Sequence, residues 1–181
     1  MILIGMGANL PTVYGEPRDT LKAAIAAMPA FGISIRKCSS FYLTPAMAEY
    51  VQPPYVNAVA SIETALPAPD LLAALHRVEA MFGRVREARW APRTLDLDLL
   101  DYDGEVVVAT GPRGLEAGPG VLPMALPHPG MAERGFVLVP LLEIAPEWRH
   151  PVLGEGAARL IEEVKAGQGA AAIAEIERLP A

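Results

Sequence analysis

The sequence has little cysteine, little basic charge and no long uninterrupted hydrophobic run. Its 181 residues include one cysteine, Cys38, so a small disulfide-stabilised scaffold is excluded. The 15 Lys and Arg against 21 Asp and Glu give a formal net charge of −6, which argues against general nucleic-acid binding. Uncharged stretches are broken by Gly, Pro, Asn or His, and the start of the chain lacks the basic segment of a secretory signal. We therefore expect a cytoplasmic protein of one domain, with at most an appended tail and no membrane partner, in which Cys38 is a small packed residue.

Basic residues are concentrated in one short segment of this acidic chain. Residues 82–94 contain Arg84, Arg86, Arg89 and Arg93 against one acidic residue, Glu87. A guanidinium presents a planar fork that fits phosphate oxygens, so the cluster favours a compact anion site. The alternative is a solvated, salt-bridged helix end.

Apolar periodicity predicts an α+β domain with helices packed on a mixed or antiparallel sheet. The expected strands cover residues 1–6, 33–42, 55–62 and 95–102, the last followed by a hairpin turn at 103–104. The expected helices cover residues 17–28, 66–83 with Gly83 at the C′ position, and 157–165. Residues 134–144 are predicted as a strand that passes into a short helix, and residues 44–54 and 109–126 as loops.

An Asp-Leu-Asp motif directly follows the arginines. In a strand, Asp96 and Asp98 share one face about 7 Å apart, where they can clamp a divalent ion. Mg²⁺ is often held by one or two carboxylates together with substrate phosphates. An exposed edge strand is the alternative for the motif alone, and the preceding arginines favour the metal. Because the chain lacks a glycine-rich phosphate loop, side chains such as Arg84, Arg93 and Arg134 would hold the phosphates.

Other candidate binding residues each have a structural alternative. Trp90 either closes over a ligand or folds back on the protein surface. His128 either points at a ligand, because flanking prolines restrict its backbone, or has a structural role. Asn57 and Tyr55 share one strand face, where they can bind the amide edge and the ring of a heterocycle, or cap an edge and fill the core. A solvated helix flank is the default interpretation for His76 and Glu79.

Four segments in this order carry a resemblance to a known family: SSFYLTPAM, QPPYVNAV, RVEAMFGRVREARWAPRTLDLDLL and LPHPGMAERGFVLVPLLEIAPEW. Together they resemble the hydroxymethyldihydropterin pyrophosphokinases of folate synthesis. The resemblance covers residues 1–151 and implies a ferredoxin-like α+β fold, three-layered α/β/α with a mostly antiparallel sheet. It divides the chain into a pyrophosphokinase domain over residues 1–155 and a C-terminal helical tail over 156–181 with no assigned role.

The resemblance also implies the reaction. Pyrophosphate passes from ATP to the hydroxymethyl group of 6-hydroxymethyl-7,8-dihydropterin with release of AMP, supported by two Mg²⁺ ions, in a monomer or weak homodimer. Two alternatives remain: another Mg²⁺-dependent phosphoryl or nucleotidyl transferase, and a ligand-binding descendant without catalysis.

Matching positions carry the family's site residues onto this chain. Asp96 and Asp98 are implied as metal ligands, acting in catalysis with Arg84 and Arg93. The implied ATP-binding residues are His76, Glu79, Arg84, Arg86, Trp90, Arg93, His128 and Arg134. The implied pterin-binding residues are Thr44, Pro45, Met47, Tyr55, Asn57, Trp90 and Phe136. The chain departs from the usual family pattern at Ala46, Ala48, Ala91 and Gly130.

Overall fold

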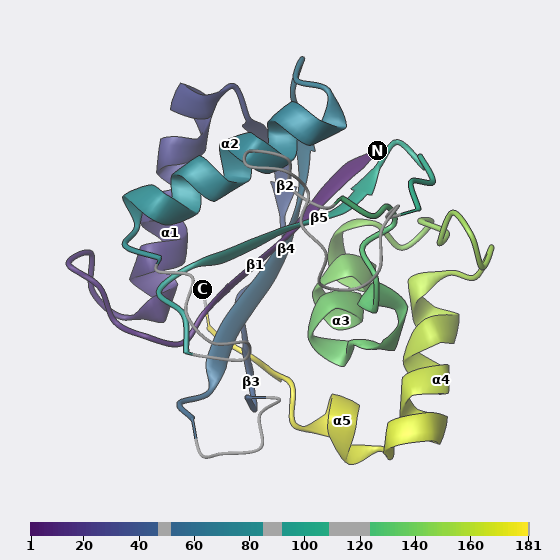
Figure 1. Ribbon diagram of the computed structural model, residues 1–181. Helices are drawn as coiled ribbons and strands as arrows, with labels where there is room; N and C mark the ends of the chain where they lie inside the picture. The colour runs from purple at the N-terminus through teal and green to yellow at the C-terminus, as the bar shows by residue number, and fades with distance from the viewer. Residues whose placement is uncertain (47–51, 85–91, 109–123, 181) are drawn as a thin grey trace.

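The computed structural model describes residues 1–46, 52–84, 92–108 and 124–180 (Figure 1). Its strands are β1 (Ile2–Ala8), β2 (Ser34–Cys38), β3 (Tyr42–Thr44), β4 (Tyr55–Glu63), β5 (Asp96–Tyr102) and β6 (Glu177–Arg178). Its α-helices are α1 (Pro17–Ala27), α2 (Ala68–Met81), α3 (Gly135–Ile144), α4 (Ala157–Gln168) and α5 (Ala171–Ala174). Two short 3₁₀ helices are η1 (Met28–Phe31) and η2 (Met131–Glu133). No helix in these described ranges combines the length and apolarity needed to cross a bilayer.

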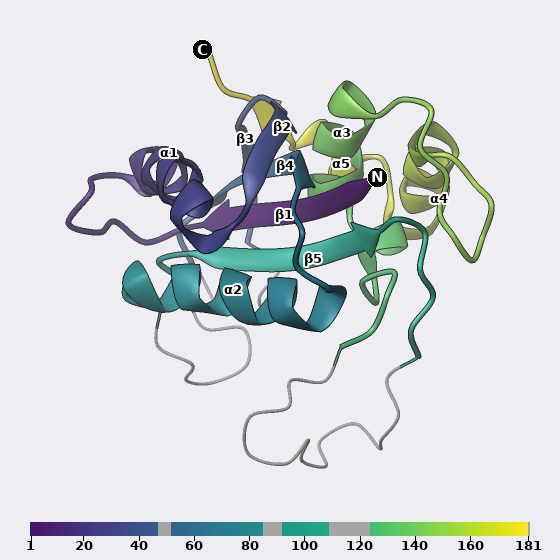
Figure 2. The same cartoon turned by 90° about the horizontal axis from the view of Figure 1, so that it is seen from above.

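The strands form one sheet in the order β5-β1-β4-β3-β6, and β2 also pairs with β4. All the described strand pairings are antiparallel. Helices α1 and α2 cover one face of the sheet, α3 packs on the other face, and α4 packs against α3 (Figures 1 and 2). This arrangement confirms the predicted ferredoxin-like, three-layered α+β fold.

Alternation along the strands separates the two cores. Ile2, Ile4 and Met6 of β1 face α1 and α2, whereas Leu3 faces α3 and α4. Beyond Leu3, the α3 side of β1 carries only Gly5 and Gly7, which leave the middle of this face without large side chains. The sheet therefore has an open space above Gly5 and Gly7 that its own side chains do not fill.

A bulge sets which side chains of β5 face each layer. The β1–β5 register shifts between Leu3 and Ile4, opposite Asp101 and Leu99, so Leu100 is the extra residue and packs in the α3 core. Asp101 lies buried within β5. Its carboxylate accepts hydrogen bonds from Trp148 Nε1 at 2.7 Å and from the turn amide of Gly104 at 2.8 Å.

Residues 134–144 correct one prediction, because they form the helix α3 and contain no strand. The buried side of the helix packs between the sheet and α4, and its partly exposed positions Phe136, Val139 and Leu142 are also apolar, so no polar stripe marks the helical period. A short apolar run of this kind has the same pattern in a buried strand and in a buried helix.

Three further expectations near strand ends are wrong. The single strand expected over 33–42 is divided into β2 and β3, because buried Ser39 bonds to β4 through its own amide and hydroxyl. The turn at 103–104 forms, but the segment after it bridges Val107 to Leu126 instead of pairing with β5. Cys38 is exposed and not packed, because β2 has β4 as its only partner strand among the described residues and most of its side chains face solvent.

Candidate active site

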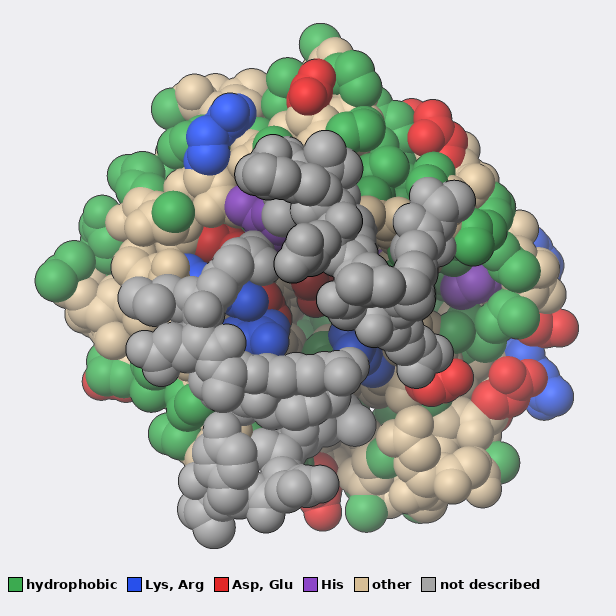
Figure 3. Space-filling model, in the orientation of Figure 1, with side chains coloured by type: hydrophobic (Ala, Val, Ile, Leu, Met, Phe, Trp, Pro, Cys, Tyr) green, Lys and Arg blue, Asp and Glu red, His purple; other side chains and the backbone are tan. Residues whose placement is uncertain are grey.

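A pocket of about 370 Å³ lies over the α3 side of the sheet. Its floor comes from β1, β4 and β5, and its walls come from the end of β3, the C-terminal half of α2 and the start of α3. Figure 3 shows basic and acidic side chains together around a hollow at the centre of this face. The predicted site residues that line it are Thr44, Pro45, Tyr55, Asn57, His76, Glu79, Arg84, Arg93, Asp96, Asp98, His128, Arg134 and Phe136. The other three predicted residues, Met47, Arg86 and Trp90, lie outside the described residues.

Strand register arranges the pocket floor in rows. Gly7 pairs with Asn57 on one side and with Asp96 on the other, so these residues lie in one row across three strands. Gly5 similarly stands between Val59 and Asp98 in the next row. Since neighbouring strands are about 4.8 Å apart, Asn57 and Asp96 are separated by roughly 10 Å with a glycine between them.

The two glycines of β1 were predicted only as the end of a strand, and their place in the pocket was missed. A Cβ on Gly7 would lie 2.7 Å from Asn57 Oδ1, far inside van der Waals contact. A Cβ on Gly5 would meet the Leu100 side chain at 3.4 Å. The Gly-Met-Gly alternation was the available sequence signal, because it removes side chains from one face of a strand.

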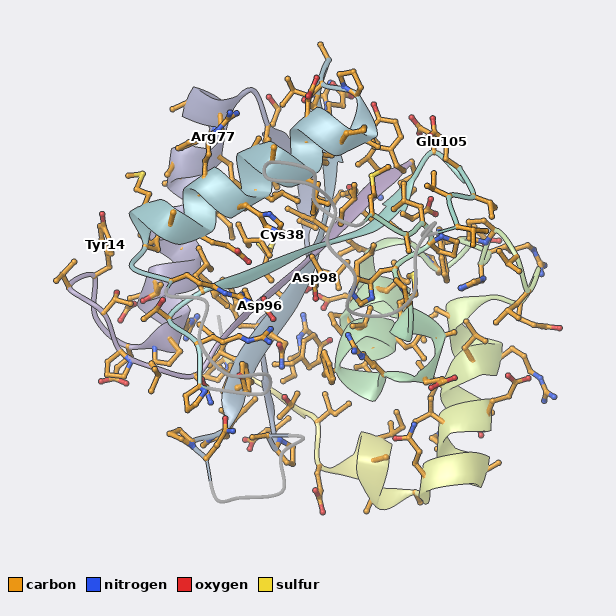
Figure 4. All side chains as sticks on the ribbon, viewed as in Figure 1. Tyr14, Cys38, Arg77, Asp96, Asp98 and Glu105 are labelled. Carbon is orange, nitrogen blue, oxygen red and sulfur yellow. The ribbon has the colours of Figure 1, made fainter. Side chains whose placement is uncertain are left out.

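Asp96 and Asp98 lie close together on the side of β5 that faces the pocket (Figure 4). The Asp98 side chain is 40% exposed, and its Oδ1 lies 3.8 Å from His128 Nε2. Burial and the negative charge of Asp96 raise the pKa of Asp98, and they outweigh the opposing effects of His128, Arg134 and Arg93. A cation placed between the two carboxylates would relieve this repulsion.

Two arginines from the basic segment close one end of the pocket. Arg84 Nη1 donates to Leu95 O at 3.1 Å and pairs with Glu79 Oε1 at 3.0 Å and with Asp96 Oδ1. Arg93 pairs with the other oxygen of Asp96. Burial disfavours the charged form of Arg84, but Asp96 and Glu79 more than compensate and raise its pKa. Ion pairs with Asp96 therefore hold both guanidiniums beside the acidic strand.

Glu79 links α2 to the acidic strand. Its side chain is 3% exposed, and Oε1 accepts a hydrogen bond from the Leu97 amide at 2.8 Å as well as the pair from Arg84. The bond to Leu97 fixes the backbone between Asp96 and Asp98. The default interpretation of Glu79 as part of a solvated helix flank is wrong, because the side chain is buried and its described bonds position the residues around it. Its contact with ATP stays a prediction.

The opposite end of the pocket carries aromatic rings and an amide. Asn57 Nδ2 donates to Thr44 Oγ1 at 2.7 Å, and this buried bond fixes the orientation of the amide. Tyr55 lines the pocket from β4, and Phe136 lines it from the start of α3. The guanidinium carbon of Arg134 lies 5.9 Å from the centre of the Phe136 ring.

His128 enters the pocket from the segment before α3. Its amide donates to Leu100 O at 2.8 Å, which attaches the segment to the end of β5. Burial and Arg134 lower the pKa of His128, against the raising effect of Asp98. Its buried Nδ1 has no hydrogen-bond partner among the described residues.

Asn9, at the end of β1, was not singled out from the sequence. Its buried side chain accepts the Arg93 amide at 2.7 Å and donates to Pro53 O at 3.1 Å and to Gln52 Oε1 at 3.3 Å. The end of β1 therefore joins the segments that flank both ends of the pocket. No periodic pattern or motif marks such a residue, since its role depends on contacts distant in sequence.

The fold and the pocket together define a ferredoxin-like protein with a pocket of small-molecule size, which carries arginines and carboxylates at one end and an amide and two aromatic rings at the other. Residues 3–146 match the family model of the 7,8-dihydro-6-hydroxymethylpterin-pyrophosphokinases. The chain belongs to this family of folate-synthesis enzymes.

Named relatives agree with the family model. The chain is 40% identical over 163 residues to the 2-amino-4-hydroxy-6-hydroxymethyldihydropteridine pyrophosphokinase of Synechocystis sp., covering 90% of this chain and 75% of the relative. It is 41% identical over 143 residues to the enzyme of the same name from Haemophilus influenzae, covering 78% of this chain and 79% of the relative.

Solved structures support the fold. The wild-type Plasmodium falciparum HPPK-DHPS crystal structure superposes with a TM-score of 0.69 at 12% identity and covers 98% of this chain. This chain spans 46% of that longer chain, so the likeness concerns the fold of one part of it.

Proposed function

We propose that this pocket transfers pyrophosphate from ATP to the hydroxymethyl group of 6-hydroxymethyl-7,8-dihydropterin. The pterin hydroxyl oxygen bonds to the β-phosphorus of ATP, the bond from that phosphorus to the oxygen bridging to the α-phosphate breaks, and AMP leaves as the hydroxyl proton is released. The observation that supports this proposal most directly is the row formed by Asn57, Gly7 and Asp96. It brings a ring-binding amide and a phosphate-side carboxylate into one pocket about 10 Å apart.

The pterin binds at the end of the pocket formed by β3, β4 and α3. Tyr55 and Phe136 contact the two faces of the ring. Asn57 Oδ1 faces the glycine floor, so it accepts hydrogen bonds from the amide edge of the ring while Thr44 holds the amide in place. Because Gly7 has no side chain, the ring can lie directly on the sheet.

The triphosphate binds at the opposite end. Arg84 and Arg93 are already held there as cations, and both can exchange a carboxylate oxygen for a phosphate oxygen. Arg134 and His128 reach the phosphates from the segment before α3, and His76 from α2. Little covalent work is left for the protein, so catalysis consists of alignment and charge neutralisation.

The acidic pair fits Mg²⁺. Within the described ranges no cluster of three or more His, Cys, Asp and Glu side chains is placed to hold a metal. The two carboxylates of β5 would therefore share a metal ion with other ligands. Two carboxylates suit Mg²⁺, which commonly completes its octahedron with phosphate oxygens and water. We assign Asp96 and Asp98 to two such ions. When bound, these ions would neutralise phosphate charge and favour in-line displacement.

We propose a monomer or a weak homodimer as the active form.

The separate roles of the two ends of the pocket can be tested by titration. Asn57→Ala should weaken pterin binding about tenfold or more and leave the binding of a non-hydrolysable ATP analogue within about threefold. Arg93→Ala should show the reverse pattern. Equal losses of both ligands in either variant would contradict these assignments.

A further inference from the structure

The part of the chain that follows the family match packs against the walls of the pocket. Residues 147–180 include α4, α5 and β6, and the last two lie beside elements that carry pterin-side residues (Figure 1). Helix α5 packs against α3, and β6 pairs with β3. The tail therefore has two separate contacts with the walls of the pocket.

The first contact is at Gly135, the first residue of α3. A Cβ on Gly135 would lie 2.6 Å from Ile173 Cδ1, 3.0 Å from Ala172 O and 3.0 Å from Ile176 Cδ1. The tail is thus seated directly on the backbone between the two pocket residues Arg134 and Phe136. A wall packed this closely has little freedom to shift without displacing α5.

The second contact is along β3. Tyr42 and Leu43 pair with Arg178 and Glu177, and Thr44, whose hydroxyl fixes Asn57, is the next residue of the same strand. The Arg178 Nε donates to Ser40 Oγ at 2.7 Å.

A carboxylate of α3 joins these elements. Glu143 accepts hydrogen bonds from the Ser40 amide at 3.0 Å and from the Tyr42 hydroxyl at 2.9 Å, and it pairs with Arg178 at 3.1 Å. The start of β3, the end of α3 and β6 are therefore tied at one point, although Arg178 and Glu143 are partly solvated and their pair alone contributes little.

We propose that residues 169–180 position the pterin-binding wall of the pocket, with Ile173 and Ile176 acting as positioning residues for Phe136 through Gly135. The proposal rests on the proposed function for the identity of the ligand. It gives the C-terminal tail a role in substrate affinity, beyond the pyrophosphate-transfer assignments above.

A reciprocal pair of substitutions tests the contact with α5. Gly135→Ala places a methyl group against Ile173 and should weaken pterin binding about threefold to tenfold, because α5 or the start of α3 must move. Ile173→Ala should weaken it by less. In the double variant the new methyl group occupies space that Ile173 vacates, so pterin affinity should exceed that of Gly135→Ala alone.

Ile25→Ala provides the matched control. Ile25 is also a half-buried isoleucine, but it packs in the α1 and α2 layer on the opposite face of the sheet. This variant should lower the thermal stability of the protein and leave pterin affinity within about twofold of wild type. An equal loss of pterin affinity in Ile25→Ala and Ile173→Ala would show that general destabilisation causes the loss, and it would overturn the proposal.

Amide hydrogen exchange on the free protein tests the same contact without the ligand. The Val137 and Leu138 amides donate to Arg134 O at 3.0 Å in the first turn of α3. Their exchange should accelerate in Gly135→Ala and in Ile173→Ala, slow again in the double variant, and stay at the wild-type rate in Ile25→Ala. If wild type fails to bind the pterin, the proposed function is wrong while the exchange pattern still decides whether the tail positions this wall. Unchanged exchange in both single variants, or exactly additive effects in the double variant, would overturn the inference.

Discussion

Gly7→Ala is the smallest change that should separate pterin binding from nucleotide binding. Gly7 lies near the C-terminal end of β1 with ordinary extended backbone, so alanine is sterically allowed by the main chain. The difficulty is space alone, because the new Cβ would stand 2.7 Å from Asn57 Oδ1. Restoring a normal contact requires a shift of about 0.7 Å in an amide that is buried and held by Thr44.

The expected size of the effect follows from the hydrogen bonds that this shift removes. Loss of two bonds between Asn57 and the ring, at about 0.5–1.5 kcal/mol each, corresponds to roughly 1–3 kcal/mol of binding free energy. Pterin affinity should therefore fall about fivefold to 150-fold. Overpacking costs about 1–3 kcal/mol of stability and is partly offset by about 0.4–1 kcal/mol from the stiffer unfolded chain, so the variant should remain folded.

Calorimetric titration of the pterin and of a non-hydrolysable ATP analogue measures both affinities on one preparation. Gly5→Ala is the matched control, since it adds the same methyl group to the same face of β1 but meets Leu100 at 3.4 Å, a distance that the flexible side chain accommodates. The control should keep pterin affinity within about threefold of wild type. A folded Gly7→Ala protein with wild-type pterin affinity, or equal losses in the two variants, would refute the floor geometry.

Two other changes probe the acidic strand and a buried histidine. Asp98→Ala should reduce transfer by about 100-fold or more. The protein should stay folded, since this carboxylate is partly exposed and the charge of Asp96 already disfavours its ionised form by raising its pKa. Loss of the fold on circular dichroism, or full activity, would contradict its role. His150 Nδ1 accepts the amides of Val152 and Leu153 at 3.2 Å, and burial lowers the pKa of His150 despite the charge of Asp101. The unfolded chain then binds the proton more readily, so the stability that neutral His150 contributes is present above about pH 6.5 and is lost as the pH falls through the lowered folded pKa. His150→Asn keeps an acceptor that does not titrate, so denaturant unfolding should show a smaller loss of stability between about pH 7.5 and about pH 5 than in wild type; an identical loss would exclude His150 as the cause.

Local patterns in the sequence predicted the parts of the fold that depend on neighbouring residues. The stripe of α2 and its end were predicted correctly, and Gly83 adopts a left-handed φ of 77° after the helix. The alternating faces of β4 were also predicted correctly. One face packs on α1 and α2, and the other carries Tyr55 and Asn57. Helix α3 could not be distinguished from a strand, since its partly exposed positions are apolar as far as Leu142 and no polar stripe marks the helical period on which such predictions depend.

The sequence predicted many of the residues that form the site, but it did not predict how they are arranged in space. Motif and resemblance named most of the polar residues that line the pocket, but they did not reveal that Gly7 separates Asn57 from Asp96. That row depends on the pairing of strands far apart in the sequence, which no local pattern encodes. For the same reason the contact between Gly135 and Ile173 could not be foreseen, because it joins the pocket to a tail that had no assigned role.

Release of AMP tests the central claim most directly. Purified protein is incubated with ATP and Mg²⁺, with and without 6-hydroxymethyl-7,8-dihydropterin, and the nucleotide and pterin products are identified by chromatography and mass. We expect AMP only when the pterin is present, in equal amount to a pterin product heavier by one pyrophosphate group. Formation of ADP, or AMP release that does not depend on the pterin, would contradict pyrophosphate transfer in this pocket.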